Sequence, residues 1–149
     1  SSTGRILDAV SILLGFSKNE RKEKHEATYL LEKNSTIPYK DLKPKIKNSI
    51  LLTTPLFEYL IKNLHKDKKR LAATAQLYIA EGLHKIIYLE TKNYKLKTIL
   101  SGGISNNKII SDYFESKGVL QNKKSCIARG DAGLSVGQIY HYLYPHEDF

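Results

Sequence analysis

The sequence of 149 residues contains no methionine, no tryptophan and only one cysteine, Cys126. A single cysteine excludes a disulfide within the chain and is typical of the reducing cytoplasm, where we expect the protein to reside. The longest apolar runs, residues 12–16 and 50–52, fall far below the ~20 residues that a membrane-spanning helix needs. We therefore expect no membrane association. The missing methionine and the Ser-Ser-Thr start indicate a processed chain or one piece of a longer protein.

Acidic residues are also scarce: the chain has 15 aspartates and glutamates against 24 lysines and arginines, and its net charge is +9. The basic residues are scattered along the chain, which is typical of a solvated surface. The alternative is an electrostatic footprint for RNA or another acidic partner. The sequence has no aromatic-interleaved RNA-binding signature, so the charge permits RNA as a partner without favouring it.

Hydrophobic periodicity predicts a helix-rich α/β chain that forms a single domain over residues 1–149. Helices are predicted over residues 1–16, 26–33, 55–64, 67–92, 106–117 and 132–144. Strands are predicted at 96–100 and 125–128, with a weaker candidate at 49–53, and residues 37–47 are predicted to be irregular. The order strand–helix–strand–helix at the end of the chain predicts a right-handed βαβ unit, and hence a small, mainly parallel sheet. Such a sheet is undersized for a complete parallel fold.

Two glycine-bearing segments, residues 100–107 and 128–138, each follow a predicted strand and open a predicted helix. Because the carboxyl ends of parallel strands meet at one sheet edge, we expect the two turns to face a common cleft. The turn Ser101-Gly102-Gly103 would let backbone N–H groups approach a nucleotide or another phosphate-bearing ligand. The alternative is a tight strand-to-helix turn and nothing more. The P-loop and Gly-x-Gly-x-x-Gly patterns are absent, so Walker and Rossmann sites are not expected.

Three polar side chains near these segments and in the first helix each have a structural and a functional interpretation. The Asn107 carboxamide either faces the cleft or caps the following helix. Asp131 is either an N-cap or a ligand of a metal or phosphate at the sheet edge. Asp8 is either a surface carboxylate or an acceptor for a ribose hydroxyl. The histidines have no metal-ligand spacing, and the chain shows no nucleophile–base arrangement, so no catalytic residue is assigned.

Three segments resemble, in the same order, motifs of the hydrogenase-maturation carbamoyltransferases (the HypF family). The first, Ser-Ser-Thr-Gly-Arg-Ile-Leu-Asp-Ala-Val at residues 1–10, is similar to the family's Ser-Ser-x-Gly-Arg-Leu-Phe-Asp-Ala-Val. Residues 100–107, Leu-Ser-Gly-Gly-Ile-Ser-Asn-Asn, look like Leu-Ser-Gly-Gly-x-x-x-Asn. Residues 130–138 are similar to Asn-Asp-Gly-Gly-x-x-x-Gly-Gln. Each motif is weak alone, but together they are specific and span nearly the whole chain.

The resemblance implies the C-terminal lobe of a domain that is shared with the tRNA threonylcarbamoyladenosine synthases and has an actin/sugar-kinase-like (ASKHA) fold. The implied activity uses ATP or a carbamoyl-adenylate to carbamoylate a cysteine of a partner protein in [NiFe]-hydrogenase maturation. Asp8 matches the family aspartate at the adenylate ribose, and Gly102, Gly103 and Asn107, with Ser101, match the nucleotide-binding loop. Asp131 matches the carboxylate that completes a divalent metal site (Fe, Zn or Mg).

The departures from the family pattern concern the metal site and one nucleotide contact. The family's two metal-binding histidines have no counterpart in this sequence, so the implied metal site is incomplete. We expect the missing first lobe or a partner subunit to supply them, and the chain alone to be inactive. Residues 23–25 read Glu-Lys-His where the family has Tyr-Glu-Gly, while Gly130 and Ala132 replace asparagine and glycine. The alternatives are a non-catalytic nucleotide-binding or protein-interaction module and, ranked lower, a role linked to tRNA threonylcarbamoylation.

Overall fold

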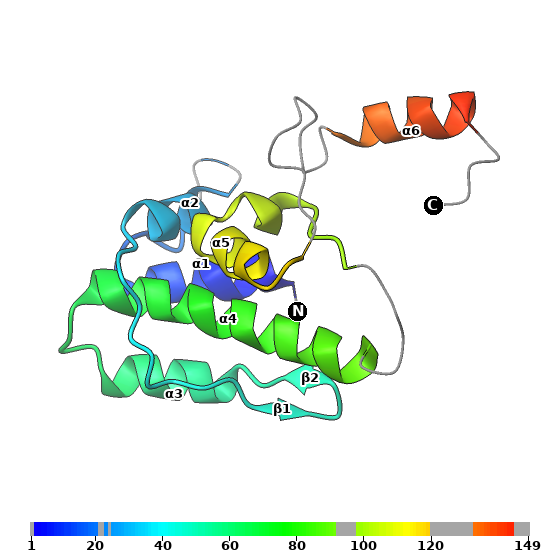
Figure 1. Ribbon diagram of the computed structural model, residues 1–149. Helices are drawn as coiled ribbons and strands as arrows, with labels where there is room; N and C mark the ends of the chain where they lie inside the picture. The colour runs from blue at the N-terminus through cyan, green and yellow to red at the C-terminus, as the bar shows by residue number, and fades with distance from the viewer. Residues whose placement is uncertain (1, 21–22, 24, 92–97, 120–132, 145–149) are drawn as a thin grey trace.

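The computed structural model describes the chain except for residues 1, 21–22, 24, 92–97, 120–132 and 145–149 (Figure 1). The described part is mainly helical and contains one short sheet. Its elements, in chain order, are α1 (Thr3–Leu14), α2 (Glu26–Lys33), β1 (Ile46–Lys47), β2 (Ile50–Leu51), α3 (Thr54–Lys62), α4 (Lys68–Thr91), the 3-10 helix η1 (Gly103–Asn106), α5 (Lys108–Ser116) and α6 (Leu134–Leu143).

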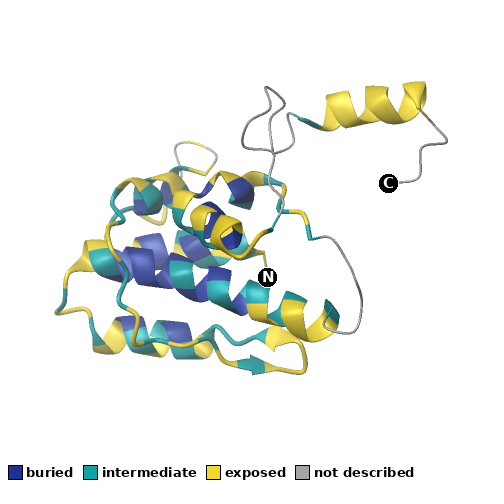
Figure 2. Cartoon of the chain, in the orientation of Figure 1, coloured by how far each residue is buried: buried dark blue, intermediate teal, exposed yellow. Residues whose placement is uncertain are grey.

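Helix α4 runs through the middle of the body that α1–α5 and the hairpin form (Figure 1). It packs against α1, α2 and α5 on one side and against α3 and β2 on the other. Neighbours on both sides require a helix that is apolar around much of its circumference. The sequence supplies this with small side chains that let the neighbours approach closely, namely Ala72, Ala73, Ala75 and Ala80, all of which are buried (Figure 2).

The helix ends follow from capping residues that the sequence displays. Gly15 adopts a left-handed φ of 79° and ends α1, and its N–H donates to Ile12 O at 3.0 Å. Asp67 precedes α4, and its carboxylate accepts a 2.8 Å hydrogen bond from the Lys69 N–H. Gly118 has a φ of 72° just beyond α5. The predicted helices 26–33 and 67–92 are confirmed almost to the residue by the bounds of α2 (Glu26–Lys33) and α4 (Lys68–Thr91).

The predicted mainly parallel sheet is wrong for the described residues, which form a two-stranded antiparallel sheet with Ile46 opposite Leu51. The physical reason is the turn between the strands. Asn48 and Ser49 have φ values of 50° and 58°, and two successive left-handed residues join antiparallel neighbours directly. β1 lies in the stretch that we predicted to be irregular. Of the two strands predicted to be parallel, 125–128 lies outside the described residues, as do residues 96–97. In the described remainder, residues 98–100, only Ile99 forms an isolated bridge.

The hairpin packs on α4 through a close approach at Gly82. A Cβ added to Gly82 would lie 2.5 Å from Cδ1 of Leu51, so only glycine leaves room for this side chain in its present position. The Tyr78 hydroxyl donates to Leu52 O at 2.6 Å and accepts from the Lys45 N–H at 3.3 Å. Burial raises the pKa of this phenol. The hairpin is thereby fixed on the central helix, away from the glycine turn.

Helix α6 differs from the other helices because none of its residues is buried. Its exposed side chains are largely apolar or aromatic: Leu134, Val136, Ile139, Tyr140, Tyr142 and Leu143. None of the helices in the described part of the chain has the length and apolar character to cross a membrane.

Candidate functional site

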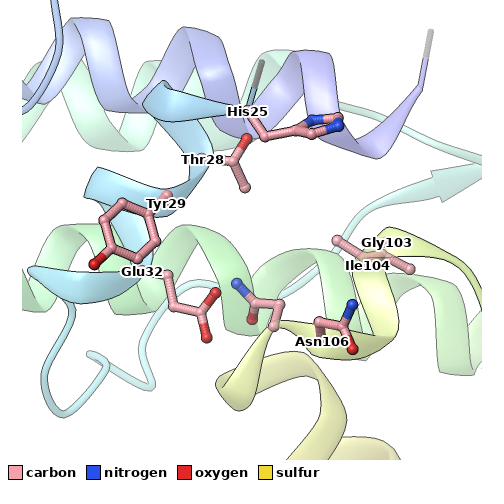
Figure 3. A pocket seen from close by; sticks show the side chains of 9 residues that line it. His25, Thr28, Tyr29, Glu32, Gly103, Ile104 and Asn106 are labelled. Atoms are coloured by element: carbon pink, nitrogen blue, oxygen red, sulfur yellow. The ribbon is translucent and has the colours of Figure 1, made fainter. Parts of the chain in front are cut away.

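A hollow of about 340 Å³ lies between the start of α1, helix α2 and the glycine turn (Figure 3). One side, which we call the α2 wall, consists of His25, Thr28, Tyr29 and Glu32. The opposite side, which we call the glycine wall, consists of Gly103, Ile104, Asn106 and Asn107. Gly4, in the first turn of α1, also lines the hollow. The volume falls in the range of small-molecule sites.

The glycine wall depends on the backbone conformation of Gly102. This residue has φ 80° and ψ −180°, a region that only glycine adopts without strain. The following chain turns at once into η1, where Ser105 donates from both its N–H (3.0 Å) and its hydroxyl (2.7 Å) to Gly102 O. An added Cβ on Gly103 would meet no other atom within 4 Å. The absence of a side chain therefore leaves the Gly103 backbone open toward the hollow.

Asn107 has the structural role that its position allowed, that of a helix cap. Its Oδ1 accepts a 3.1 Å hydrogen bond from the Ile110 N–H, which makes it the N-cap of α5. Its Nδ2 donates to Oε1 of Gln76 at 2.7 Å, and the side chain is nearly fully buried. Asn107 nevertheless lines the hollow. Its carboxamide is thus engaged at both ends within the protein and holds the glycine wall in place.

Asp8 contacts the α2 wall through a hydrogen bond with Thr28. The Thr28 hydroxyl donates to Oδ1 of Asp8 at 2.8 Å, and Asp8 is half-buried on α1. This hydrogen bond ties the first turns of α2 to α1. His25, the residue just before α2, has a left-handed φ of 68° and is exposed at the rim.

Glu32 belongs to the α2 wall, and its carboxylate reaches across to the start of α5, next to the glycine wall. Its Oε1 accepts a 2.8 Å hydrogen bond from the N–H of Lys108, the first residue of α5. The backbone N–H groups at the start of a helix ordinarily favour an anionic ligand. The protein's own carboxylate takes that position instead, because an unpaired N–H at a helix start favours a negative partner. This end of the hollow therefore suits a neutral or hydrogen-bond-donating part of a ligand.

The predicted site residues thus fall into three groups. Gly103 and Asn107 line the hollow, whereas Ser101, Gly102 and Asp8 do not. Of these three, Gly102 directly precedes Gly103, Asp8 accepts from the lining residue Thr28, and Ser101 is exposed. Asp131 and the second glycine turn lie outside the described residues, so the expected common cleft stays a prediction. Within the described residues, no three His, Cys, Asp or Glu side chains come together as metal ligands. We therefore derive no metal-dependent step from them.

Sequence reasoning pointed to residue 25 but missed the rest of the α2 wall, Thr28, Tyr29 and Glu32, and the buried partner of Asn107. Thr28 and Glu32 are four residues apart on α2, a spacing that places them on one helix face. Gln76 was detectable in principle, because it is an amide among alanines on the apolar stripe of α4. A polar side chain at a core position needs a buried partner. The partner itself comes from residue 107 and was not evident from the helix alone.

Comparison with known proteins identifies the class. Residues 1–138 match the family described as carbamoyltransferase, Kae1-like domain, second subdomain, and the chain belongs to this family. The curated relative "Probable carbamoyltransferase HypF" of Methanocaldococcus jannaschii is 36% identical over 96% of this chain. The protein is thus a HypF-type carbamoyltransferase domain, C-terminal part.

A solved structure supports the same assignment. The crystal structure of T. kodakarensis HypF superposes with a TM-score of 0.79 at 26% identity and covers 97% of this chain. In both comparisons this chain spans 20% of the length of the relative. The resemblance seen in the three sequence motifs is confirmed at the level of the family.

Proposed function

We propose that this chain forms the nucleotide-binding part of a carbamoyltransferase that uses ATP or a carbamoyl-adenylate to modify a cysteine of a partner protein in [NiFe]-hydrogenase maturation. One observation carries the proposal: the open backbone of Gly103 borders a hollow of about 340 Å³ in a carbamoyltransferase domain. A glycine turn without side chains allows close contact with a phosphate or a sugar. The reaction is expected to take place in the cytoplasm.

The charges around the hollow favour one orientation of the nucleotide. The Glu32 carboxylate at the start of α5 would repel phosphates and accept hydrogen bonds from ribose hydroxyls or the adenine amino group. The phosphates are then expected near Gly103, Gly4 and His25, at the opposite end. The support for this orientation is the position of the Glu32 carboxylate on the Lys108 N–H.

The metal and the partner are part of the same proposal. Asp131 would contribute one carboxylate to a divalent metal (Fe, Zn or Mg), and a first lobe or partner subunit would supply the histidines. A divalent ion in such a site neutralises phosphate charge and polarises the reacting group. We propose the carbamoyl-acceptor protein as the second partner.

The test is calorimetric titration of the chain with ATP and Mg²⁺, comparing wild type with Gly103→Leu. The leucine side chain would start from a residue that lines the hollow and would meet no protein atom near its Cβ. We expect ATP affinity to fall by about tenfold or more, because each 1.4 kcal/mol of lost contact corresponds to tenfold in Kd. The free energy of unfolding should change little.

The control is Thr54→Leu at the start of α3, which adds the same side chain at an exposed position. Thr54 does not line the hollow, and α3 packs on the other side of α4 from α1, α2 and α5. This variant should bind ATP as wild type does. Equal ATP affinity in the Gly103 variant and wild type would contradict the proposed pocket. No heat with any of the three proteins would favour the non-catalytic interaction module.

A further inference from the structure

Gln76 is a fully buried amide whose hydrogen bonds reach outside its own helix. It lies on α4 with 0% of its surface exposed. Its Nε2 donates to Ala72 O at 3.0 Å and to the Ser35 hydroxyl oxygen at 2.5 Å. Its Oε1 accepts the 2.7 Å hydrogen bond from Nδ2 of Asn107. Both ends of the amide are thus engaged, each with a different neighbouring segment.

These contacts connect the two walls of the hollow. Ser35 follows the C-terminal end of α2, and its hydroxyl donates to Leu31 O at 2.7 Å, so it is fixed to the helix that carries Thr28 and Glu32. Asn107 ends the glycine wall and caps α5. The series of hydrogen bonds Ser35–Gln76–Asn107 therefore runs from the α2 wall through the core to the glycine wall.

We propose that Gln76 is a positioning residue that sets the spacing of the α2 wall and the glycine wall. It does not line the hollow, so its influence on a ligand would be indirect. In a buried network each hydrogen bond depends on the others, because a group that loses its partner has no water to replace it. The consequence for nucleotide affinity rests on the proposed function, whereas the consequence for the glycine wall does not.

The first measurement is amide hydrogen exchange of the ligand-free chain, comparing wild type with Gln76→Met. Methionine has a similar length but lacks the amide that accepts a hydrogen bond from Asn107 and donates one to Ser35. We expect the amides of Ser105, Ile110 and Ser111 to exchange about tenfold faster or more, the effect of one lost buried hydrogen bond.

The matched control is Thr74→Val, which removes a buried hydroxyl two residues away on α4. Thr74 accepts from the Tyr39 N–H at 2.8 Å and donates to Arg70 O, so it acts on another segment. A general loss of stability would raise exchange in both variants alike. The proposal requires the increase at residues 105–111 to exceed that in the Thr74 variant. Equal exchange in the two variants would overturn it.

A milder variant and an ATP titration complete the experiment. Ser35→Ala removes only the hydrogen bond between Gln76 and residue 35, at the end of the network that is far from Asn107. It should raise exchange at the same amides by about threefold, even if Gln76→Met does not fold.

The ATP affinity should fall about tenfold in Gln76→Met and stay unchanged in Thr74→Val. If wild type fails to bind ATP, the proposed function fails and the exchange data still decide the role of Gln76. If ATP binds but exchange is unaltered by both Gln76→Met and Ser35→Ala, the positioning role fails alone.

Discussion

At the scale of single residues, His25 has a backbone conformation that its side chain disfavours. Its φ of 68° is left-handed, a region that costs a residue with a Cβ roughly 1–2 kcal/mol relative to the right-handed one. The side chain is exposed, so packing does not compensate for much of this cost. The resemblance to the family places a glycine at this position, and the observed φ gives the physical reason.

We therefore expect His25→Gly to raise the free energy of unfolding by about 0.5–1 kcal/mol, less than the full conformational cost because glycine also gains freedom in the unfolded chain. Urea denaturation measures the change. His25→Ala is the control, since alanine removes the imidazole but keeps the Cβ, and it should give no increase. Equal stability of the glycine and alanine variants would show that the conformation at residue 25 is not strained.

Individual site residues were predictable where the backbone dictates the residue type. Gly102 has a conformation that requires glycine, so its role in the turn was evident from the Gly-Gly pair. Asn107 was predictable as a cap, because asparagine before an apolar helix is a common helix start. Its bond to Gln76 joins residues 31 positions apart, and no local pattern in the sequence indicates that pairing.

At the scale of elements, α4 and α5 meet through three rings. The His84 ring on α4 lies edge-on to Tyr113 at 5.8 Å and to Phe114 at 6.2 Å between centroids. Burial lowers the pKa of the His84 imidazole, and the nearby Lys117 ammonium lowers it further. The neutral ring is the form that this contact favours.

This contact predicts a pH dependence of stability. Because the pKa of His84 is lower in the folded than in the unfolded chain, the unfolded chain takes up the proton first as the pH falls. Below the unfolded pKa of about 6.5, the free energy of unfolding should therefore decrease until the folded pKa is passed. Urea denaturation at about pH 7 and about pH 5 should show this loss, and it should be smaller in His84→Phe.

Lys117→Ala provides a second check, since it removes the smaller of the two causes and should reduce the pH-dependent loss only in part. An unchanged loss of stability in His84→Phe would assign the pH dependence to other groups. Phenylalanine keeps a ring between α4 and α5, so the comparison separates titration from packing.

Helices and their ends were predictable at this scale, whereas only one strand of the hairpin was, since β2 lies within the weaker strand candidate at 49–53. Apolar spacing and the caps Gly15 and Asp67 define α1 and α4 because both signals are local. The strands β1 and β2 have two residues each, too few for an alternating pattern to appear. The signal that was present is Asn48, a residue tolerant of left-handed φ, between two apolar-containing pairs.

At the scale of the whole molecule, the chain aligns over nearly all of its own length, but it spans only 20% of the length of each of the two relatives. The three sequence motifs predicted the family because they are specific in combination. They did not predict which faces of the hollow are formed within this chain. The described residues supply an α2 wall and a glycine wall, but no group of three metal-ligating side chains.

We expect the isolated chain to bind ATP but to catalyse no carbamoyl transfer. Transfer requires the reacting groups to be held together in one geometry, and among the described residues those that line the hollow come from α1, from α2 with the preceding His25, and from the glycine turn. The measurement is ATP hydrolysis that depends on carbamoyl phosphate, with the full-length Methanocaldococcus jannaschii relative as the positive control. Carbamoyl-phosphate-dependent turnover by the isolated chain, abolished by Gly103→Leu, would show instead that this part alone contains the complete reaction centre.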